Sequence, residues 1–200
     1  MPIKTIGLDA DDTLWHNESI FHLTQRRFME LLAPYGDTEA SMARLYAVET
    51  RNLKLYGYGI KGFILSMIET AAEISDGKAP ASVIEGIIKI GRDMLQHPVE
   101  PLSGVEATVH ELRDSGYRLV LITKGNLLDQ EQKLARSGLG DYFDAIEIVS
   151  DKTAQTYRRI LAAELAPGEE TVMIGNSLRS DILPAIEAGL WGIHIPYHLT

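Results

Sequence analysis

The sequence predicts an α/β fold: a Rossmann-like parallel sheet with helices on both faces, interrupted by an all-helical insertion. Three observations predict it. After residue 98, short apolar runs alternate with helical patterns of about 10 to 15 residues, which is typical of a parallel sheet. Between residues 16 and 98, apolar residues recur only at helical spacing. Charge follows the same division, because residues 16–98 carry 9 basic and 10 acidic side chains, whereas the rest carries 10 and 18.

The first elements follow from the apolar pattern. Thr5–Leu8 is a short apolar run ending at Asp9, which predicts a buried strand. Four helices are then expected with no strand between them, at residues 18–32, 38–56, 60–75 and 81–96. We therefore expect residues 1–15 and 99–200 to form the α/β core, and residues 16–98 to form a separate helical domain.

Predicted strands and helices alternate in the second half of the chain. Strands are expected at residues 117–122, 146–149, 171–174 and 191–195, and helices at residues 105–114, 128–137, 154–165 and 181–188. Glycine or proline follows most of these helices and ends them. The result is a strand and helix alternation in which the helices cover both faces of the sheet.

Composition limits the functions that remain. The 200 residues contain no cysteine, which fits a reducing compartment, and carry a net charge of −9. An acidic chain is a poor ligand for nucleic acid polymers or anionic membranes. The sequence contains no long apolar segment and no signal peptide, so we expect a cytoplasmic protein. The oligomeric state is not predicted.

Acidic residues follow the first strand directly. Asp9, Asp11 and Asp12 place three carboxylates in four positions, where they repel one another unless a cation joins them. A hard divalent ion such as Mg²⁺ is the natural partner. An acidic turn that only caps the strand is the alternative. The carboxyl ends of parallel strands meet at one edge of a sheet, so these residues are the first candidates for a site.

Polar groups suited to an anion follow the next two strands. Thr123, Lys124 and Gly125 offer a hydroxyl and main-chain N–H groups at the start of a helix, a donor set of the size of a phosphate. The alternative for Thr123 is a helix N-cap. Lys152 follows the third strand, where a solvated lysine is the ordinary interpretation.

The fourth strand is followed by a polar loop that contains Asn176 and Asp181. Asp181 could be only a helix cap. Acidic groups able to hold a metal and donors able to hold an anion nevertheless converge on one edge of the sheet. That combination predicts phosphoryl transfer.

These four segments, in this order, resemble the four motifs of the haloacid dehalogenase superfamily, most of whose members are phosphatases. The resemblance covers essentially the whole chain, and residues 16–98 then correspond to a helical cap. The first motif, Asp-x-Asp-x-Thr, is present as Asp9, Asp11 and Thr13. The resemblance implies that Asp9 forms an aspartyl-phosphate and that Asp11 is the general acid and then the general base. Dehalogenases of the family lack the second aspartate, so Asp11 favours a phosphatase.

The resemblance also assigns the remaining motifs. It implies that Thr123 binds the transferring phosphoryl group and that Lys152 neutralises charge on Asp9 and the phosphate. Asp181 would hold Mg²⁺ with Asp9 and the main-chain carbonyl of Asp11. Asn176 departs from the family pattern, which usually has an acidic residue there, and is expected to ligate the metal more weakly or through water.

The predicted function is Mg²⁺-dependent hydrolysis of a small phosphomonoester, either a nucleotide or a sugar or other metabolite phosphate. Two alternatives stay open: phosphotransfer to a second hydroxyl, as in the family's mutases, and a catalytically weak binding module that keeps the fold. The run Gly57–Gly62 matches the letters of a dinucleotide fingerprint, but it follows a helical pattern instead of a strand. It is interpreted as a hinge between two helices, and a contact of its Lys61 with the substrate is the alternative. Trp15, His16 and Asn17 either line the pocket, as the family's flap does, or have ordinary packing and surface roles.

Overall fold

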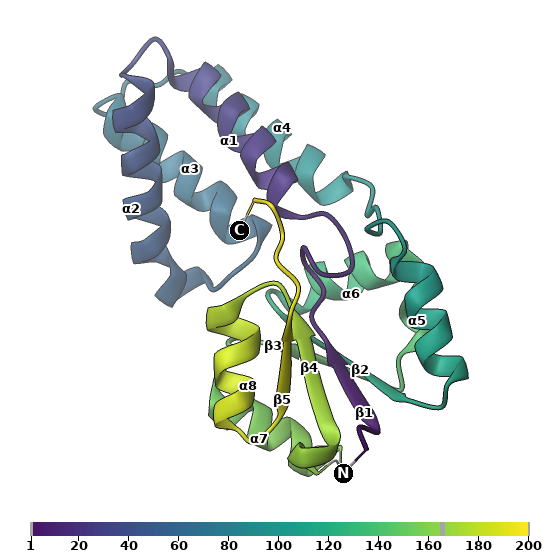
Figure 1. The fold of residues 1–200 in the computed structure, drawn as a ribbon. Coiled ribbons are helices and arrows are strands. Elements are labelled where there is room, and N and C mark those ends of the chain that lie inside the picture. The colour runs from purple at the N-terminus through teal and green to yellow at the C-terminus, as the bar shows by residue number, and fades with distance from the viewer. Residues whose placement is uncertain (1, 165–166, 200) are drawn as a thin grey trace. The chain divides into compact units, whose positions relative to one another are not determined.

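The structure is a computed structural model that describes residues 2–164 and 167–199 (Figure 1). The chain divides into two compact units: residues 1–18 together with 99–200, and residues 19–98. The sequence analysis placed the first boundary between residues 15 and 16, whereas this division falls after Glu18. None of the helices in the described ranges is long and apolar enough to cross a membrane.

The first unit contains a five-stranded sheet in which the neighbouring strands pair in parallel, as predicted. Its strands are β1 (Thr5–Leu8), β2 (Arg118–Lys124), β3 (Ala145–Val149), β4 (Thr171–Gly175) and β5 (Trp191–His194). The strand order is β3-β2-β1-β4-β5, so β1 lies in the centre (Figure 1). Leu8 lies opposite Leu121 of β2 and Ile174 of β4. The first motif therefore begins at the middle of the carboxyl edge of the sheet.

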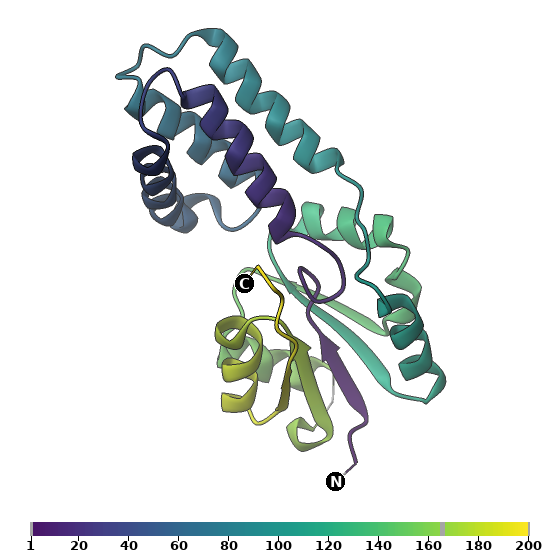
Figure 2. The ribbon, with the colours of Figure 1, turned by 45° about the horizontal axis from the view of Figure 1, so that its top comes forward.

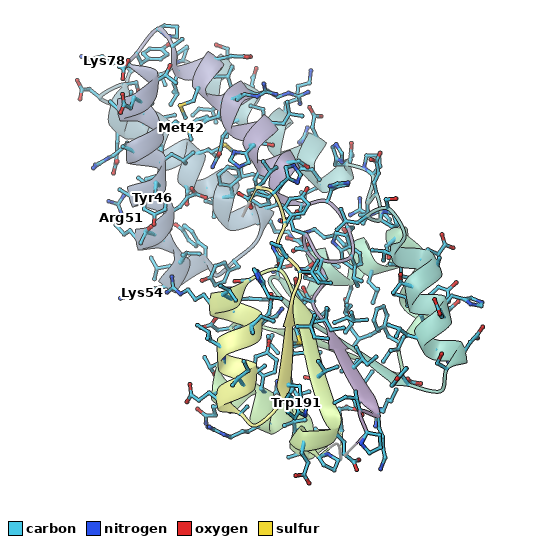
Figure 3. All side chains as sticks on the ribbon, viewed as in Figure 1. Met42, Tyr46, Arg51, Lys54, Lys78 and Trp191 are labelled. Atoms are coloured by element: carbon cyan, nitrogen blue, oxygen red, sulfur yellow. The ribbon has the colours of Figure 1, made fainter. Side chains whose placement is uncertain are left out.

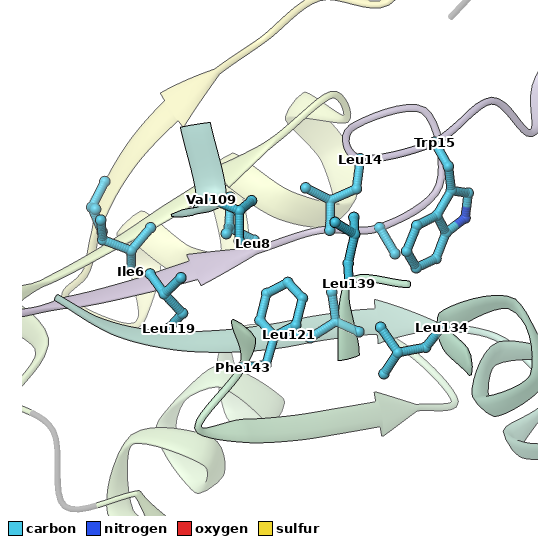
Figure 4. Packing of buried hydrophobic residues seen from close by; sticks show 12 residues of the cluster. Ile6, Leu8, Leu14, Trp15, Val109, Leu119, Leu121, Leu134, Leu139 and Phe143 are labelled. Atoms are coloured by element: carbon cyan, nitrogen blue, oxygen red, sulfur yellow. The ribbon is translucent and has the colours of Figure 1, made fainter. Parts of the chain in front are cut away.

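Helices cover both faces of this sheet. They are α5 (Val105–Asp114), α6 (Leu127–Ser137), α7 (Ala154–Ala163) and α8 (Leu183–Glu187). Leu119 and Leu121 of β2 pack in one apolar cluster with residues of α5 and α6 (Figure 4). Val120 and Ile122 pack in another, with residues of α7 and α8. Side chains of a strand point alternately to its two faces, so this division shows a doubly covered sheet.

Most boundaries lie within one residue of those expected, and three regions differ by more. β2 extends to Lys124 because Thr123 and Lys124 still pair with Ile148 and Val149 of β3. Asp181 lies in a π-helical turn, Leu178–Ile182, which precedes α8. The predicted end of the helix at Leu165 lies outside the described residues, and the described helix α7 ends at Ala163. Two short 3₁₀ turns, Gly140–Tyr142 and Gly168–Glu170, precede β3 and β4.

The inserted segment consists of α1 (Glu18–Leu32), α2 (Thr38–Tyr56), α3 (Ile60–Ile74) and α4 (Ala81–Gln96), close to the helices expected. Phe28, Met67 and Ile87, from three of these helices, are completely buried in one cluster. Helices α1 and α4 run side by side in Figures 1 and 2, and Arg27 of α1 pairs with Asp93 of α4 at 3.4 Å. The helical periodicity of the sequence therefore produces a separate apolar core.

An ion-pair network joins α2 to α3. Arg51, which Figure 3 labels on α2, donates to Glu69 at 2.7 Å and to Glu73 at 3.0 Å. Gly57 and Gly59 connect the two helices with φ values of 68° and 129°, conformations that favour glycine. Helix α2, and not a strand, comes directly before this connection, so the glycines join two helices and lack the strand that a dinucleotide site requires.

Candidate active site

The three acidic residues after β1 have three separate sets of partners. The main-chain carbonyl of Ala10 accepts from Thr13 and Leu14, which turns the chain sharply after Asp9. Asp12 sits at φ 63°, and its carboxylate accepts from the main-chain N–H groups of two residues at the start of α1, at 2.9 and 3.0 Å. Asp12 is therefore a helix cap. The Asp12 carboxylate therefore has main-chain partners of its own, apart from Asp9 and Asp11, which are the two aspartates expected at the metal.

Lys152 joins the ends of three strands. Its ammonium group donates to Asp9 after β1 and, at 2.7 Å, to Asp181 after β4. Lys152 is only 5% exposed and both aspartates are buried. The ordinary interpretation of Lys152 as a solvated surface lysine is therefore wrong: it is a buried cation held between two carboxylates.

Burial and neighbouring charges change the pKa values of Asp9 and Lys152. Burial and the nearby Asp181 carboxylate together raise the pKa of Asp9 to about 6, although the Lys152 ammonium opposes the shift. Burial alone would lower the pKa of Lys152, but the charges of Asp9 and Asp181 outweigh it and raise that pKa above its ordinary value. The three side chains carry a net charge of −1 when all are ionised.

Gly175, the last residue of β4, makes room for Asp181. A Cβ atom at residue 175 would lie 2.5 Å from the Cγ atom of Asp181, closer than two unbonded carbon atoms can approach. The other carboxylate oxygen of Asp181 accepts from the main-chain N–H of Ser177 at 2.9 Å. Asp181 is therefore fixed both by the loop and by the missing side chain at residue 175.

Thr13 connects the first motif to Asn176. Its hydroxyl donates to the Asp9 carboxylate at 3.0 Å and accepts from the Asn176 main-chain N–H at 3.1 Å. The Asn176 side-chain oxygen lies 3.4 Å from the same hydroxyl. Thr13 thus links Asn176 to Oδ2 of Asp9, while Lys152 bonds to Oδ1.

Asp11 is held by three donors. Lys133 and Trp15 donate to one carboxylate oxygen, both at 2.8 Å, and Gln130 donates to the other at 2.9 Å. Burial alone would raise the pKa of Asp11, but the Lys133 ammonium and these hydrogen bonds lower it below the ordinary value. Lys133 and Gln130 are not among the site residues expected from the sequence. Their only signal there is two polar residues three positions apart on one helix.

Residues of the second motif, Thr123 and Lys124, also contact the side-chain amide of Gln130. Thr123 is buried, and its hydroxyl oxygen lies 3.1 Å from the Gln130 amide nitrogen, which also donates to the Lys124 carbonyl at 2.9 Å. The Lys124 ammonium lies 3.4 Å from the Ser180 hydroxyl. Thr123 is not the N-cap of α6, because Asn126 fills that role. Gly125 approaches Gln130 so closely that a Cβ there would lie 2.9 Å from the amide nitrogen.

The flap residues have local partners within the first unit. Trp15 is buried in the apolar cluster with Leu8 and also donates to Asp11, so its packing role is confirmed and it also serves the site. His16 bonds to the Tyr197 hydroxyl at 2.7 Å, a contact that the sequence did not reveal.

The donor set fits a hard divalent cation. Asp9 and Asp181 are carboxylates that share one ammonium group, and Asn176 adds an amide oxygen near the Thr13 hydroxyl that bonds to Asp9. Mg²⁺ commonly uses one or two carboxylates and completes its shell with water. Within the described ranges, no three His, Cys, Asp or Glu side chains come together as a metal-binding group. The Asp11 carboxylate is occupied by its own donors, which leaves the main-chain oxygen that the resemblance assigns to the metal.

Comparison with known families decides the classification. A model of the haloacid dehalogenase-like hydrolase family matches residues 3–189. The chain belongs to this family. A haloacid dehalogenase-like family hydrolase from Xanthomonas campestris has a crystal structure similar to this one, with 49% sequence identity and a TM-score of 0.92. The similarity covers 98% of this chain and 82% of that one.

Curated members of the haloacid dehalogenase-like family are also similar over most of the chain. A glyceraldehyde 3-phosphate phosphatase from Methanothermobacter thermautotrophicus is 31% identical, over 99% of this chain and 88% of its own. The pyrimidine 5′-nucleotidase YjjG from Escherichia coli is 29% identical, over 92% of this chain and 82% of its own. This chain is accordingly a hydrolase of a family whose similar curated members are phosphatases.

Proposed function

We propose that this protein is a Mg²⁺-dependent phosphatase that hydrolyses a small phosphomonoester through an aspartyl-phosphate on Asp9. The observation that supports this most strongly is the buried trio of Asp9, Lys152 and Asp181, beside a second aspartate that has its own donors. A lone carboxylate repels a phosphate dianion, so a phosphatase needs cations at its nucleophile. Lys152 supplies one of them.

The proposed reaction has two steps. In the first, an Asp9 oxygen attacks phosphorus, a P–O bond forms to Asp9, and the P–O bond to the leaving group breaks while Asp11 gives the leaving oxygen a proton. In the second, Asp11 takes a proton from water as that water attacks phosphorus, which releases inorganic phosphate and restores Asp9. The donors around Asp11 favour its ionised form, and this form is the one that the second step requires.

The other residues orient the phosphoryl group and the metal. Thr123 is proposed to bind a phosphate oxygen, with Lys124 beside it. The Gly125 N–H, expected from the sequence to be a phosphate donor, instead donates to the Val149 carbonyl at 3.1 Å. Asp9, Asp181 and the main-chain carbonyl of Asp11 would hold Mg²⁺, with Asn176 as a weaker ligand or a partner of a metal-bound water. When bound, Mg²⁺ would neutralise charge on the phosphate and the nucleophile.

The substrate class rests on the relatives and on the resemblance. The similar curated proteins are named for a triose phosphate and for pyrimidine nucleotides, which are small phosphate esters. We extend that class to this chain and propose that residues 16–98 are its cap. Dehalogenation is disfavoured because it needs no second aspartate at Asp11 to protonate a leaving group.

Phosphate release from a panel of substrates tests the proposal. Wild-type protein, Asp9→Asn and the surface control Asp141→Asn are incubated with nucleoside monophosphates, glyceraldehyde 3-phosphate and sugar phosphates, with Mg²⁺ or with a chelator. We expect Mg²⁺-dependent release by wild type and Asp141→Asn, and none by Asp9→Asn. Borohydride applied during turnover should reduce the phosphorylated aspartate to homoserine, which mass spectrometry locates at residue 9.

The alternatives predict different results. A mutase would transfer the phosphoryl group to an added alcohol or sugar in preference to water. A binding module would release no phosphate from any substrate although it is folded. Full activity of Asp9→Asn would show that the nucleophile is misassigned.

A further inference from the structure

We infer that helix α6 supplies a two-point clamp, made by Gln130 and Lys133, that fixes the orientation of the Asp11 carboxylate during catalysis. Both are positioning residues, because they act through Asp11 and not on the substrate. This inference rests on the proposed function, in which Asp11 transfers protons.

The clamp follows from spacing along α6. Residues three positions apart lie on one side of a helix, so Gln130 and Lys133 reach the same target. Lys133 donates to Oδ1 of Asp11 at 2.8 Å and Gln130 donates to Oδ2 at 2.9 Å. Donors on both oxygens fix the plane of a carboxylate as well as its position, whereas one donor leaves it free to rotate.

Lys133 also connects the two ends of the first-motif loop. Its ammonium donates to the side-chain oxygen of Asn17 at 2.8 Å in addition to Asp11. The ammonium group is mostly shielded from solvent, since the side chain is 16% exposed. An ammonium with two oxygen partners from one loop holds that loop in a single conformation.

The orientation of the Gln130 amide is set by the acceptors around it. Gln130 is 4% exposed, and its Nε2 atom lies within 3.1 Å of oxygens of Asp11, Thr123 and Lys124. Its Oε1 atom is buried without a hydrogen-bond partner among the described residues. Turning the amide over would place Oε1 against the Asp11 carboxylate and the Lys124 carbonyl, which are both acceptors. The orientation that lets Nε2 donate to Asp11 is therefore the favourable one, although it leaves Oε1 without a partner among the described residues.

Gly125 leaves the space that the clamp needs. A side chain at residue 125 would press on the Gln130 amide, since even a Cβ atom would lie 2.9 Å from Nε2. The second motif thus contributes to the clamp through a missing side chain. It also places the Thr123 hydroxyl and Asp11 on one amide, so the phosphate-binding and proton-transferring groups share one support.

The dependence of the rate on the leaving group tests the clamp. An alkyl phosphate needs a proton on its leaving oxygen, whereas p-nitrophenyl phosphate leaves as a stable anion and needs little help. We expect Gln130→Met and Lys133→Met each to lower kcat for glycerol phosphate at least about tenfold more than kcat for p-nitrophenyl phosphate. Asp11→Asn should change this ratio in the same direction, and a merely structural role would lower both rates equally.

The control variant is Arg136→Met, which removes an exposed cation from the same helix and should leave the ratio unchanged. Circular dichroism and metal titration establish that each variant is folded and binds Mg²⁺. If Lys133→Met does not fold, Gln130→Met and Asn17→Ala carry the test, because each removes one partner of the same network. Folded variants with the wild-type ratio would refute the clamp.

A wild type that is inactive on both substrates would contradict the proposed function and not the clamp. In that case a crystal structure of the Gln130→Met, Lys133→Met double variant decides. A reoriented Asp11 carboxylate supports the clamp, and an unchanged one overturns it.

Discussion

Asp9 is a carboxylate kept in an unfavourable position by its surroundings. It is buried, it lies near the like charge of Asp181, and the two share a single cation in Lys152. Burial and the charge of Asp181 both favour the neutral form of Asp9, and only Lys152 favours the ionised form. The site therefore holds excess negative charge that a divalent cation would relieve.

The raised pKa of Asp9 predicts a pH-dependent stability. A folded-state pKa of about 6, above an unfolded value of 3.8, means that folding takes up a proton between those pH values. The contribution of Asp9 to stability is complete below about pH 4 and is lost as the pH rises through 6. In metal-free buffer we expect Asp9→Asn to be about 2–3 kcal/mol more stable than wild type at pH 8 and equal to it near pH 4. Urea unfolding at both pH values measures the difference.

The control for this measurement is Asp141→Asn, at an exposed position, which should show no such difference between pH 4 and pH 8. Wild type and Asp9→Asn with equal stability at pH 8 would mean that Asp9 carries no excess charge penalty. Added Mg²⁺ should reduce the gap at pH 8 by stabilising wild type alone.

Spacing along the chain is enough to predict some of these residues. Asp9 and Asp181 each follow a strand of a parallel sheet, and a parallel sheet gathers such residues at one edge whatever the details of packing. Gln130 and Lys133 could not be predicted in this way. Whether they face Asp11 depends on the rotation of α6 about its own axis, which Leu134 and the apolar cluster set. Local sequence does not encode that rotation.

At the scale of an element, the end of β4 depends on Gly175. An alanine there would place its Cβ 2.5 Å from the Asp181 carboxylate, which is itself buried and bonded to Lys152. We expect Gly175→Ala to move Asp181, to weaken Mg²⁺ binding at least about tenfold, and to lower the free energy of unfolding by about 1–3 kcal/mol. Isothermal titration with Mg²⁺ and urea unfolding measure the two effects.

Gly140→Ala is the matched control for that substitution. The nearest atom to a Cβ at residue 140 is a Leu134 carbon at 3.8 Å, an ordinary contact distance. It should leave Mg²⁺ binding unchanged. Equal Mg²⁺ affinity of Gly175→Ala and wild type would show that Asp181 is not constrained by β4 or does not bind the metal.

Helix α2 begins at a side-chain cap. Asp37 accepts from the main-chain N–H groups of Glu39 and Ala40 at 3.0 and 3.1 Å. We expect Asp37→Ala to destabilise the helical unit by about 1 kcal/mol, and Asp37→Asn, which keeps a capping oxygen, to cost much less. Hydrogen exchange of the α2 and α3 amides reports this locally. Identical protection in both variants would contradict the capping role.

Element boundaries were predicted well where local signals decide them. The helices expected at residues 18–32, 38–56 and 105–114 have the same bounds in the structure. The end of β2 was not, because its last residues, Thr123 and Lys124, are polar and only their pairing with β3 keeps them in the strand. The π-helical turn around Asp181 likewise has no signature in the local sequence.

At the scale of the whole molecule, the two units have separate apolar cores. The clusters around Leu121 and Ile122 belong to the sheet, and the cluster around Met67 belongs to the helical insertion. The chain segments that lead into and out of the insertion are joined within the first unit: Trp15 pairs with Pro101, and the His16 N–H donates to the Glu100 carbonyl at 3.2 Å.

Excision of the insertion tests the independence of the sheet. Residues 19–98 are replaced by a short Gly-Ser linker between Glu18 and Val99. We expect the sheet to fold and to unfold cooperatively in urea, because its core is intact and a shorter connection has a smaller closure entropy. Hydrogen exchange should show protection in β1, β2 and β4. A chain without protected strand amides would show that the sheet needs the helical unit to fold.

The pairing of Trp15 with Pro101 also matters for how such a protein can change over generations. Both ends of the insertion leave the sheet at one closed point, so a different segment spliced between them disturbs neither the strand order nor the residues at the strand ends. The inserted segment can then change in evolution while the residues at the strand ends stay the same. A new segment grafted at this point could change what the enzyme selects while the reaction it performs stays the same.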